Sequence, residues 1–156
     1  MSRVQLALNV DDLESAVDFY SKLFATEPAK VRPGYANFAV VEPPLKLVLF
    51  ENLGQGGTLN HLGVEVGTPE EVGAAQARLA REGMAPDAED DVACCYARQD
   101  KVWVDGPSGE PWEIYTVLES VEMPGGLSCA VDPETGKNRC DVAGNSSVEA
   151  ASSHCC

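Results

Sequence analysis

Apolar and polar residues alternate near the N-terminus, and this pattern predicts a β-strand over residues 4–10. Gln5, Ala7 and Asn9 would share one face of that strand, with the leucines and valines on the other face. A polar side chain that can bind metal therefore opens a strand whose opposite face is apolar.

A helix is expected over residues 13–24, because apolar residues recur there at helical spacing. Asp11 or Asp12 can cap its N-terminus. Two strands, over residues 35–41 and 45–50, are predicted after it, separated by a turn that contains two prolines.

The same order of elements starts again at residue 58. Residues 61–66 are predicted as a strand that opens with His61. Thr68 is the expected N-cap of a second helix, Pro69 suits its first position, and Gly83 is expected to end it.

Two further strands are expected at about residues 93–98 and 101–104. A glycine- and proline-containing turn at residues 105–109 separates them from a last strand at residues 112–118. Each half of the chain thus has a strand, a helix and then two or three strands, which indicates a duplicated unit.

The two copies differ in length. Gln5 and His61 hold equivalent places 56 positions apart, whereas Lys46 and Glu113 hold equivalent places 67 positions apart, so the second copy is 11 residues longer between these landmarks. The extra length is expected within residues 83–98. An insertion beside a site is often functional, because loops carry binding groups on a rigid scaffold.

The predicted fold class is therefore α+β, with two βαβββ modules. One domain is expected over residues 1–119, with module one at 1–56 and module two at 57–119. From residue 120 onward the apolar pattern stops, and glycine, serine, asparagine and alanine dominate. A flexible, cysteine-containing tail is expected over residues 120–156.

Composition and charge exclude some classes of binding partner. The chain has 156 residues, 44% of them hydrophobic, and a net charge of −14. This charge argues against nucleic acid and anionic membranes as partners, since phosphate binding needs clustered lysine and arginine. No apolar run approaches transmembrane length, and the N-terminus does not resemble a signal peptide. A cytoplasmic location is the resulting expectation.

Gln5, His61 and Glu113 are the candidate metal ligands, because divalent first-row metals bind imidazole, carboxylate and amide oxygen donors. Each also has an ordinary explanation. A histidine in a strand is more often a hydrogen-bonded core residue, and glutamine or glutamate in a strand is usually just polar. The duplication favours the metal hypothesis, since it gives the three residues a reason to converge.

Six cysteines are present, and a reducing compartment disfavours a disulfide framework. Cys94 and Cys95 are adjacent, so a regular strand would point them to opposite faces, and joint action requires a loop or turn. They are either two small buried residues or a chelate for a soft ion such as trivalent arsenic, antimony or cadmium.

The remaining four cysteines lie in the expected tail, at Cys129, Cys140, Cys155 and Cys156. They are interpreted as free thiols without a function of their own. The alternative is an arm that collects thiophilic metal ions.

Taken together, the modules resemble the vicinal oxygen chelate superfamily, which includes glyoxalases and extradiol dioxygenases. The segments HLGV at residues 61–64 and GEPWEIY at residues 109–115 carry this resemblance. It implies a curved mixed sheet that forms a half-barrel cup with the helices outside. It also implies one divalent metal ion on Gln5, His61 and Glu113, with Glu113 as the catalytic residue. Extradiol dioxygenases have histidine at the first position, so Gln5 departs from their pattern.

A narrower resemblance is to the organoarsenical C–As lyases and the cadmium-induced proteins. The segments that carry it are PGYANF (33–38), PLKLVL (44–49), GTLNHLGVEV (57–66), CCYA (94–97) and QDKVWV (99–104). It implies a non-haem Fe(II) enzyme that uses O2 to cleave the carbon–arsenic bond of trivalent organoarsenicals, with Cys94 and Cys95 binding the arsenic. Nickel, cobalt and manganese are other ions for this site.

The resemblance also implies a small trivalent organoarsenical as the substrate, and a homodimer is expected because members of the family are often dimers. Two other functions stay open at this point. One is a cadmium- or arsenite-sequestering protein without turnover, which needs thiols but no open metal site. The other is an extradiol-type dioxygenase, which would not need Cys94 or Cys95.

Overall fold

The computed structural model describes residues 2–94, 96–121, 128–131 and 138–141. The strands and helices in chain order are β1 (Arg3–Val10), α1 (Leu13–Phe24), β2 (Lys30–Arg32), β3 (Tyr35–Val40), β4 (Leu45–Glu51), β5 (Leu59–Glu65), α2 (Pro69–Arg81), β6 (Asp87–Cys94), β7 (Ala97–Asp105), β8 (Pro111–Ser120), β9 (Ser128–Val131) and β10 (Asn138–Asp141).

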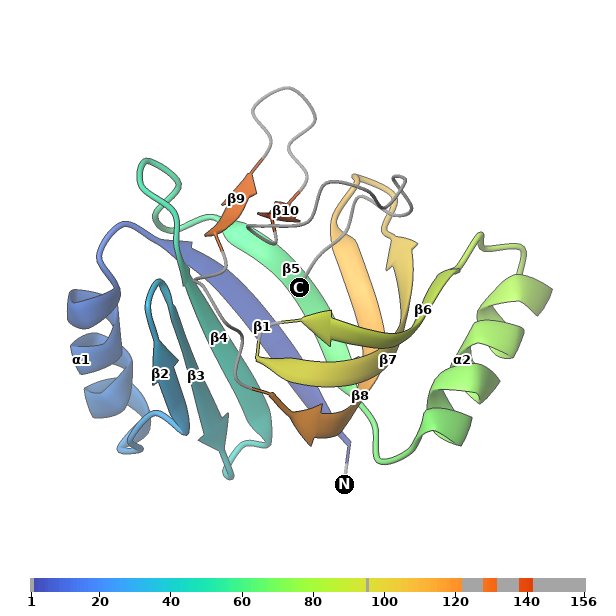
Figure 1. Ribbon diagram of the computed structural model, residues 1–156, viewed down its shortest axis with the longest axis horizontal. Coiled ribbons are helices and arrows are strands. Elements are labelled where there is room, and N and C mark those ends of the chain that lie inside the picture. The colour runs from blue at the N-terminus through green and yellow to red at the C-terminus, as the bar shows by residue number, and fades with distance from the viewer. Residues whose placement is uncertain (1, 95, 122–127, 132–137, 142–156) are drawn as a thin grey trace.

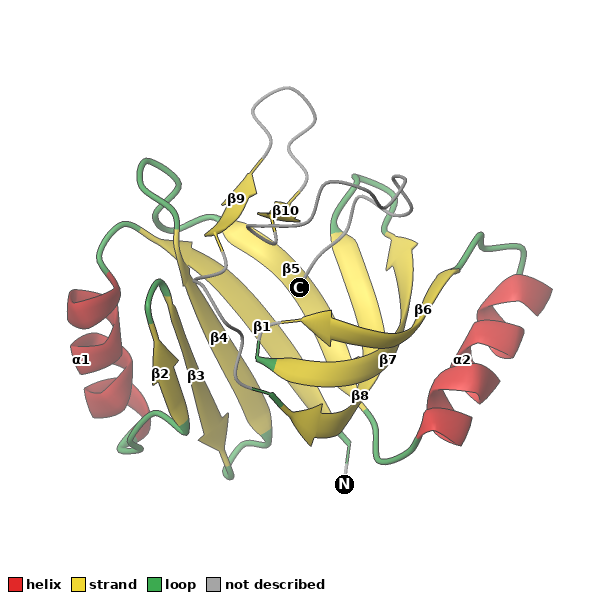
Figure 2. Ribbon diagram, in the orientation of Figure 1, coloured by secondary structure: helices red, strands yellow, loops and turns green. Residues whose placement is uncertain are grey.

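Eight strands form one mixed sheet in the order β2-β3-β4-β1-β5-β8-β7-β6. The two modules meet at the centre, where β1 and β5 pair antiparallel. Beside this pair, β1 is parallel to β4 and β5 is parallel to β8. The sheet curves into a cup with α1 and α2 outside it, one at each end (Figures 1 and 2). The predicted pair of βαβββ modules and the α+β class are confirmed.

Local sequence explains the helices. Asp12 accepts a hydrogen bond from the backbone N–H of Ser15 and so caps α1. Thr68 and Glu71 form the reciprocal capping box of α2, with Pro69 at its start.

Each helix packs on the outer face of its own module. Apolar residues of α1 cover a buried cluster on β3 and β4 that includes Phe38, Leu47 and Leu49. Val72 and Leu79 of α2 pack with Val102 of β7 in a second cluster. Because each module has its own outer core, the inner face of the sheet is free to carry polar groups.

Two details differ from the sequence prediction. The strand expected at residues 93–98 is wrong, since β6 ends at Cys94 and β7 begins at Ala97, so a hairpin turn lies inside that range. Tyr96 has a φ of 63°, the left-handed conformation that reverses the chain. The helical spacing of apolar residues over residues 13–24 includes Leu23 and would place it toward the sheet, but 58% of its surface is exposed.

The extra length of module two lies partly in this hairpin, because β6 has 8 residues and its counterpart β2 has 3. In the segment where no regular pattern was predicted, β9 and β10 form a separate two-stranded sheet. Cys155 and Cys156 lie outside the described residues.

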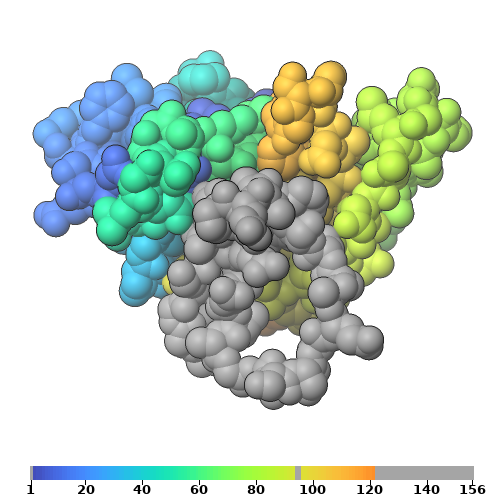
Figure 3. Space-filling model, turned by 90° about the horizontal axis from the view of Figure 1, so that it is seen from above, coloured from blue at the N-terminus to red at the C-terminus, as the bar shows by residue number. Residues whose placement is uncertain are grey.

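Seen from above, the first module lies on one side of the molecule and the second on the other (Figure 3). Among the described residues, neither helix is long and apolar enough to span a membrane.

A candidate metal and substrate site in the cup

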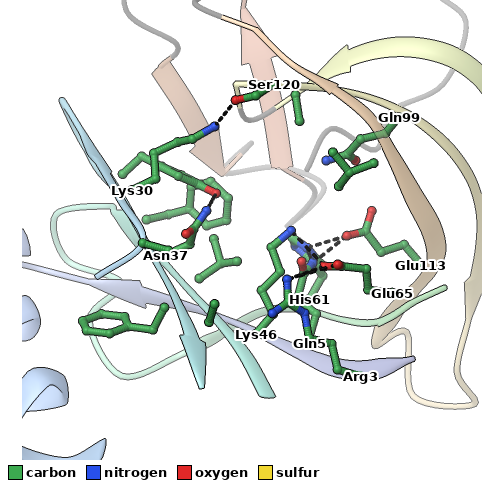
Figure 4. Close-up of a pocket in the computed structure, with 18 residues that line it drawn as sticks. Arg3, Gln5, Lys30, Asn37, Lys46, His61, Glu65, Gln99, Glu113 and Ser120 are labelled. Carbon is green, nitrogen blue, oxygen red and sulfur yellow. Dashed lines mark hydrogen bonds and ion pairs between the residues drawn. The ribbon is translucent and has the colours of Figure 1, made fainter. Parts of the chain in front are cut away.

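A cavity of about 250 Å³ lies between the two modules on the inner face of the sheet. Both modules line it. Its polar lining includes Arg3, Gln5, Lys30, Asn37, Lys46, His61, Glu65, Gln99, Glu113 and Ser120 (Figure 4). Tyr35, Phe38, Val48 and Phe50 form an apolar part of the wall. The cavity thus combines a charged cluster at one end with an aromatic and aliphatic surface.

Strand register brings the three candidate ligands together. Gln5 on β1 is the register partner of Gly63 on β5, and Gly63 is also the partner of Glu113 on β8. His61 lies two residues before Gly63 and therefore on the same face of β5. The predicted convergence depends on this register, which joins residues up to 108 positions apart.

Gly63 leaves the space in which two of these side chains meet. A Cβ atom at this position would lie 3.1 Å from Cγ of Glu113 and 3.3 Å from both Cβ and Nε2 of Gln5. These distances are too short for unstrained contacts, so a glycine between the two ligands keeps the row of three positions open.

The donor atoms of the triad are close and buried. Nε2 of Gln5 lies 2.9 Å from Nε2 of His61 and donates to Oε1 of Glu113 at 2.6 Å. Nε2 of His61 and Oε1 of Glu113 are 3.3 Å apart. All three residues are at most 3% exposed. Neighbouring donors that each lie about 2.1 Å from one small cation are separated by about 3 Å, so the separation of Nε2 of His61 and Oε1 of Glu113 fits two ligands of one divalent metal ion, and Gln5 would join them through its amide oxygen.

The surroundings of His61 prepare its Nε2 atom to bind a metal. The amide nitrogen of Asn60 donates to Asn9 at 2.9 Å, which turns the amide oxygen of Asn60 toward Nδ1 of His61, 2.7 Å away. Nδ1 therefore carries the hydrogen, and the lone pair of Nε2 faces the cavity. A fixed tautomer of this kind is typical of metal-binding histidines.

Glu113 is held as a carboxylate. Burial by itself would raise its pKa, but the Lys101 ammonium and, more weakly, the Lys46 charge lower the pKa of Glu113 below its ordinary value. Nζ of Lys101 lies 3.3 Å from Oε2 of Glu113, and Lys101 is only 1% exposed. Since Lys101 contacts Oε2, the other oxygen, Oε1, remains directed at Gln5 and His61.

Gln5 is connected to a second buried network. The hydroxyl group of Tyr115 lies 2.6 Å from Oε1 of Gln5 and 2.9 Å from Oε2 of Glu65. Nη2 of Arg3 donates to both oxygens of Glu65, at 3.0 and 3.1 Å, and Nζ of Lys46 lies 3.4 Å from Oε2. These contacts fix Glu65 behind the tyrosine.

The charges of this network follow from its contacts. Burial would raise the pKa of Glu65, but Lys46, the Tyr115 hydrogen bond and Arg3 lower it below its ordinary value. Burial, followed by the charges of Glu113 and Glu65, raises the pKa of Tyr115 far above its ordinary value. Glu65 is therefore an anion, and Tyr115 keeps its proton.

The cysteine pair lies at the β6–β7 hairpin. Cys94 ends β6 and is the register partner of Ala97, whereas Cys95 lies outside the described residues. Tyr96, next in the chain, is 4% exposed and packs against Tyr35 of module one, with ring centroids 5.5 Å apart. Lys30 donates to the backbone oxygen of Tyr96 at 3.1 Å and to Ser120 at 2.9 Å. The hairpin turn is thus anchored to the opposite side of the cup.

Several residues of the site were missed at the sequence level: Lys46, Asn60, Glu65, Lys101 and Tyr115. Lys101 had a usable signal, because it alternates with Gln99 and Trp103 on what proves to be the buried face of β7. A lysine that is buried on the inner face of a sheet needs a charged partner, and Glu113 supplies it. The others gave no signal, since their partners come from distant strands.

Within the described part of the chain there is no cluster of three histidine, cysteine or carboxylate side chains. Gln5 contacts both His61 and Glu113 and, through its amide oxygen, is the candidate for a third protein ligand. Histidine, carboxylate and an oxygen donor with further positions open form a set that suits Fe(II) and other divalent first-row ions.

Comparison with known proteins identifies related sequences. The family model of the Glyoxalase/Bleomycin resistance protein/Dioxygenase superfamily matches residues 3–114. A protein of Thermomonospora curvata named trivalent organoarsenical cleaving enzyme is 66% identical over 118 residues, which are 75% of this chain and 78% of that protein. The cadmium-induced protein CadI of Mycobacterium bovis is 65% identical over 125 residues, covering 80% of this chain and 82% of its own.

The fold is also found among solved structures. The Mn(II)-bound glyoxalase from Novosphingobium aromaticivorans superposes with a TM-score of 0.55 at 17% identity, over 81% of this chain and 44% of that one. The matching family model covers every element from β1 to β7 and the start of β8. The chain belongs to the glyoxalase/bleomycin resistance protein/dioxygenase superfamily, the vicinal oxygen chelate proteins.

Proposed function

We propose that the protein cleaves the carbon–arsenic bond of trivalent organoarsenicals, such as methylarsenite and aromatic arsenicals, and releases arsenite in a reaction that needs Fe(II) and O2. The observation that carries the proposal is the meeting of Gln5, His61 and Glu113 at one end of the cavity. It is supported by the 66% identity to a protein named for cleavage of trivalent organoarsenicals.

Gln5, His61 and Glu113 are the proposed protein ligands of the metal. Fe(II) on this triad would supply open coordination positions for O2 beside the arsenical. Nickel, cobalt or manganese would fit the same donors. Glu113 remains ionised at neutral pH because the charges of Lys101 and Lys46 lower its pKa. The Nε2 atom of His61 has its lone pair directed at the cavity, since the N–H group at Nδ1 donates a hydrogen bond to Oδ1 of Asn60.

Cys94 and Cys95 are the proposed ligands of the trivalent arsenic atom. Thiolates bind such soft ions strongly. The backbone of Cys94 ends β6 beside Tyr96, whose buried ring contacts Tyr35. Tyr35 lines the cavity that Glu113 also lines. Arsenic bound at the turn would accordingly be held beside the cup, and the carbon–arsenic bond would be oriented by position rather than by a reactive side chain.

The apolar wall of the cavity suits the organic group of the substrate. Phe38, Val48 and Phe50 line the cavity with the triad. An aryl or methyl group on arsenic would lie against this wall and exclude water from the reacting atoms. A cytoplasmic location and a homodimer remain predictions.

The second candidate is sequestration of cadmium or arsenite without turnover. The 65% identity to CadI, a protein named for its induction by cadmium, connects the chain with that ion but names no activity. The triad separates the two, because a store for thiophilic ions needs cysteines but does not need a buried nitrogen and oxygen donor set. We therefore favour cleavage. An extradiol-type dioxygenase is the third candidate, and it would function without the two cysteines.

The deciding experiment is a product assay with methylarsenite and Fe(II)-loaded protein, under air and under nitrogen. We expect arsenite under air only, and only when Fe(II) is present. Methylarsenite that is bound and recovered unchanged under air would instead identify sequestration.

The thiol assignment has its own test. Cys94→Ser and Cys95→Ser should each lower kcat/KM for arsenite release by about 100-fold. Cys140→Ser is the matched control for loss of a thiol and should leave release unchanged at saturating substrate. Wild-type release by both turn variants would remove the cysteines from the mechanism.

A further inference from the structure

The hydroxyl group of Tyr115 has more acceptors than it can serve. It lies within hydrogen-bonding distance of Oε1 of Gln5 and of Oε2 of Glu65. A hydroxyl group has one hydrogen to donate, although it can accept two further hydrogen bonds. In the observed arrangement, where the oxygen of Gln5 faces the tyrosine, only one of these two contacts can be a hydrogen bond at a time.

The same arrangement turns the amide nitrogen of Gln5 toward the other ligands. Nε2 lies 2.6 Å from Oε1 of Glu113 and 2.9 Å from Nε2 of His61. An amide nitrogen donates hydrogen bonds and does not bind a metal ion, so Gln5 can act as a ligand only through its oxygen. Binding of a cation therefore requires the amide to turn over by half a rotation about its last bond.

In the turned orientation every contact around Tyr115 becomes a hydrogen bond. The amide nitrogen of Gln5 donates to the tyrosine oxygen, and the tyrosine donates to the carboxylate of Glu65. With the amide turned, the series Gln5–Tyr115–Glu65 contains two hydrogen bonds. In the observed orientation it contains one. In the turned orientation the tyrosine no longer has to choose between its two neighbours, and it can always donate to the charged acceptor, which forms the stronger hydrogen bond.

Glu65 is well placed to take the hydrogen of Tyr115. Its two oxygens accept from Arg3, and Lys46 lies 3.4 Å from the oxygen that faces the tyrosine. Tyr115 itself is fully buried, so water cannot substitute for either partner.

We propose that Tyr115, held by Glu65, is a positioning residue that stabilises the orientation of Gln5 in which the amide oxygen faces the metal. The proposal deepens the proposed function and rests on Gln5, His61 and Glu113 being the metal ligands. Tyr115 acts through Gln5 and touches neither metal nor substrate.

The test is a titration with Mn(II), followed by the electron paramagnetic resonance signal of the free ion. Mn(II) prefers oxygen and nitrogen donors to thiolates, so the cysteines do not compete for it. Tyr115→Phe should weaken Mn(II) binding about 10-fold, the size typical of outer partners of metal ligands. Tyr35→Phe is the matched control. It removes another buried hydroxyl group from the same cavity, one that contacts Asn37, and it should bind Mn(II) as the unmodified protein does.

A second background distinguishes positioning from damage to the fold. Gln5→Glu presents an oxygen whichever way its side chain turns, so in that background Tyr115→Phe should leave Mn(II) affinity within about 2-fold. An equal loss in both backgrounds would show a structural role and overturn the proposal. If Tyr115→Phe does not fold, Glu65→Gln decides the question, because a neutral amide is a weaker acceptor and should weaken Mn(II) binding.

The two levels of inference fail separately. His61→Ala and Glu113→Ala should abolish Mn(II) binding, and retained binding in both would refute the ligand set and with it the proposed function. Abolished binding in these two variants, together with unchanged affinity in Tyr115→Phe, would overturn the role of Tyr115 alone.

Discussion

The two modules share one plan but differ at the position that decides the chemistry. Gln5 opens the first module and His61 the second, and both point into the cup. At the equivalent place on the last strand, module one has Lys46 and module two has Glu113. Duplication could have built two similar half-sites. Because module one has a lysine in place of a carboxylate, the proposed metal site is single and lies at one end of the cavity.

The lysine of module one has taken a different task. Nζ of Lys46 lies 4.8 Å from the ring centroid of Tyr115 and pairs with Glu65. Burial lowers the pKa of Lys46, and the charges of Glu65 and Glu113 act against that shift. Module one therefore supplies Gln5 and the supporting lysine, whereas module two supplies the histidine and the acid. A duplicated scaffold can thus keep its symmetry of backbone while its chemistry becomes asymmetric.

Substitution of Glu113, compared with substitution of its counterpart Lys46, gives the largest expected effect on Mn(II) affinity and arsenite release. Glu113→Ala should lower Mn(II) affinity and arsenite release by well over 100-fold, since loss of a ligand costs more than loss of its outer partners. Lys46→Met should still bind one Mn(II), because a lysine is not a ligand here. Mn(II) titration and the arsenite assay measure both. If Glu113→Ala bound one equivalent of Mn(II) and retained full turnover, Glu113 would not be a metal ligand.

The second prediction concerns the pH dependence of the stability that Glu113 of module two contributes. The pKa of Glu113 is lowered from 4.5 to about 2, so its contribution to stability is complete above pH 4.5 and is lost as the pH falls toward 2. Denaturant unfolding of the metal-free protein and of Glu113→Gln should show a difference in stability that shrinks across this range. A difference independent of pH would contradict the assigned pKa.

A substitution at Gly63 tests whether the row formed by Gln5, Gly63 and Glu113 must leave space between the two ligands. Gly63→Ala would place a methyl group 3.1 Å from Glu113 and 3.3 Å from Gln5, and should lower Mn(II) affinity about 10-fold by separating them. Gly73→Ala is the control, since a Cβ on this α2 glycine meets nothing within 4 Å and should stabilise the helix by up to about 1 kcal/mol. Unchanged affinity in Gly63→Ala would mean that the two ligands do not need this gap.

The smallest expected effect concerns the contact between the modules at the hairpin turn. Lys30→Met removes the hydrogen bonds to Tyr96 and Ser120, and should accelerate amide hydrogen exchange in residues 92–98 by several fold. Lys22→Met is the control, because Lys22 pairs only with Asp18 on the exposed face of α1 among the contacts of the described residues. Equal exchange in both variants would show that Lys30 does not hold the turn.

The sequence was most informative where neighbouring residues decide the structure. Thr68 and Glu71 announce a helix start because their reciprocal bonds form within four residues. The hairpin turn was misplaced for the opposite reason. Tyr96 takes a left-handed conformation that no local signal requires, and its ring is stabilised by Tyr35, 61 positions earlier in the chain. Packing across the cup thus prevailed over the strand pattern of residues 93–98.

The amino-acid sequence by itself determined the duplication, the helices and most strands, and the identity of the three candidate ligands, because periodicity and capping are local properties. Only the tertiary structure decided that Gln5, Gly63 and Glu113 stand in one row, that Lys101 holds the acid, and that Tyr115 contacts Gln5. These contacts join strands from different parts of the chain, and their register is fixed by the pairing of the whole sheet rather than by any short segment.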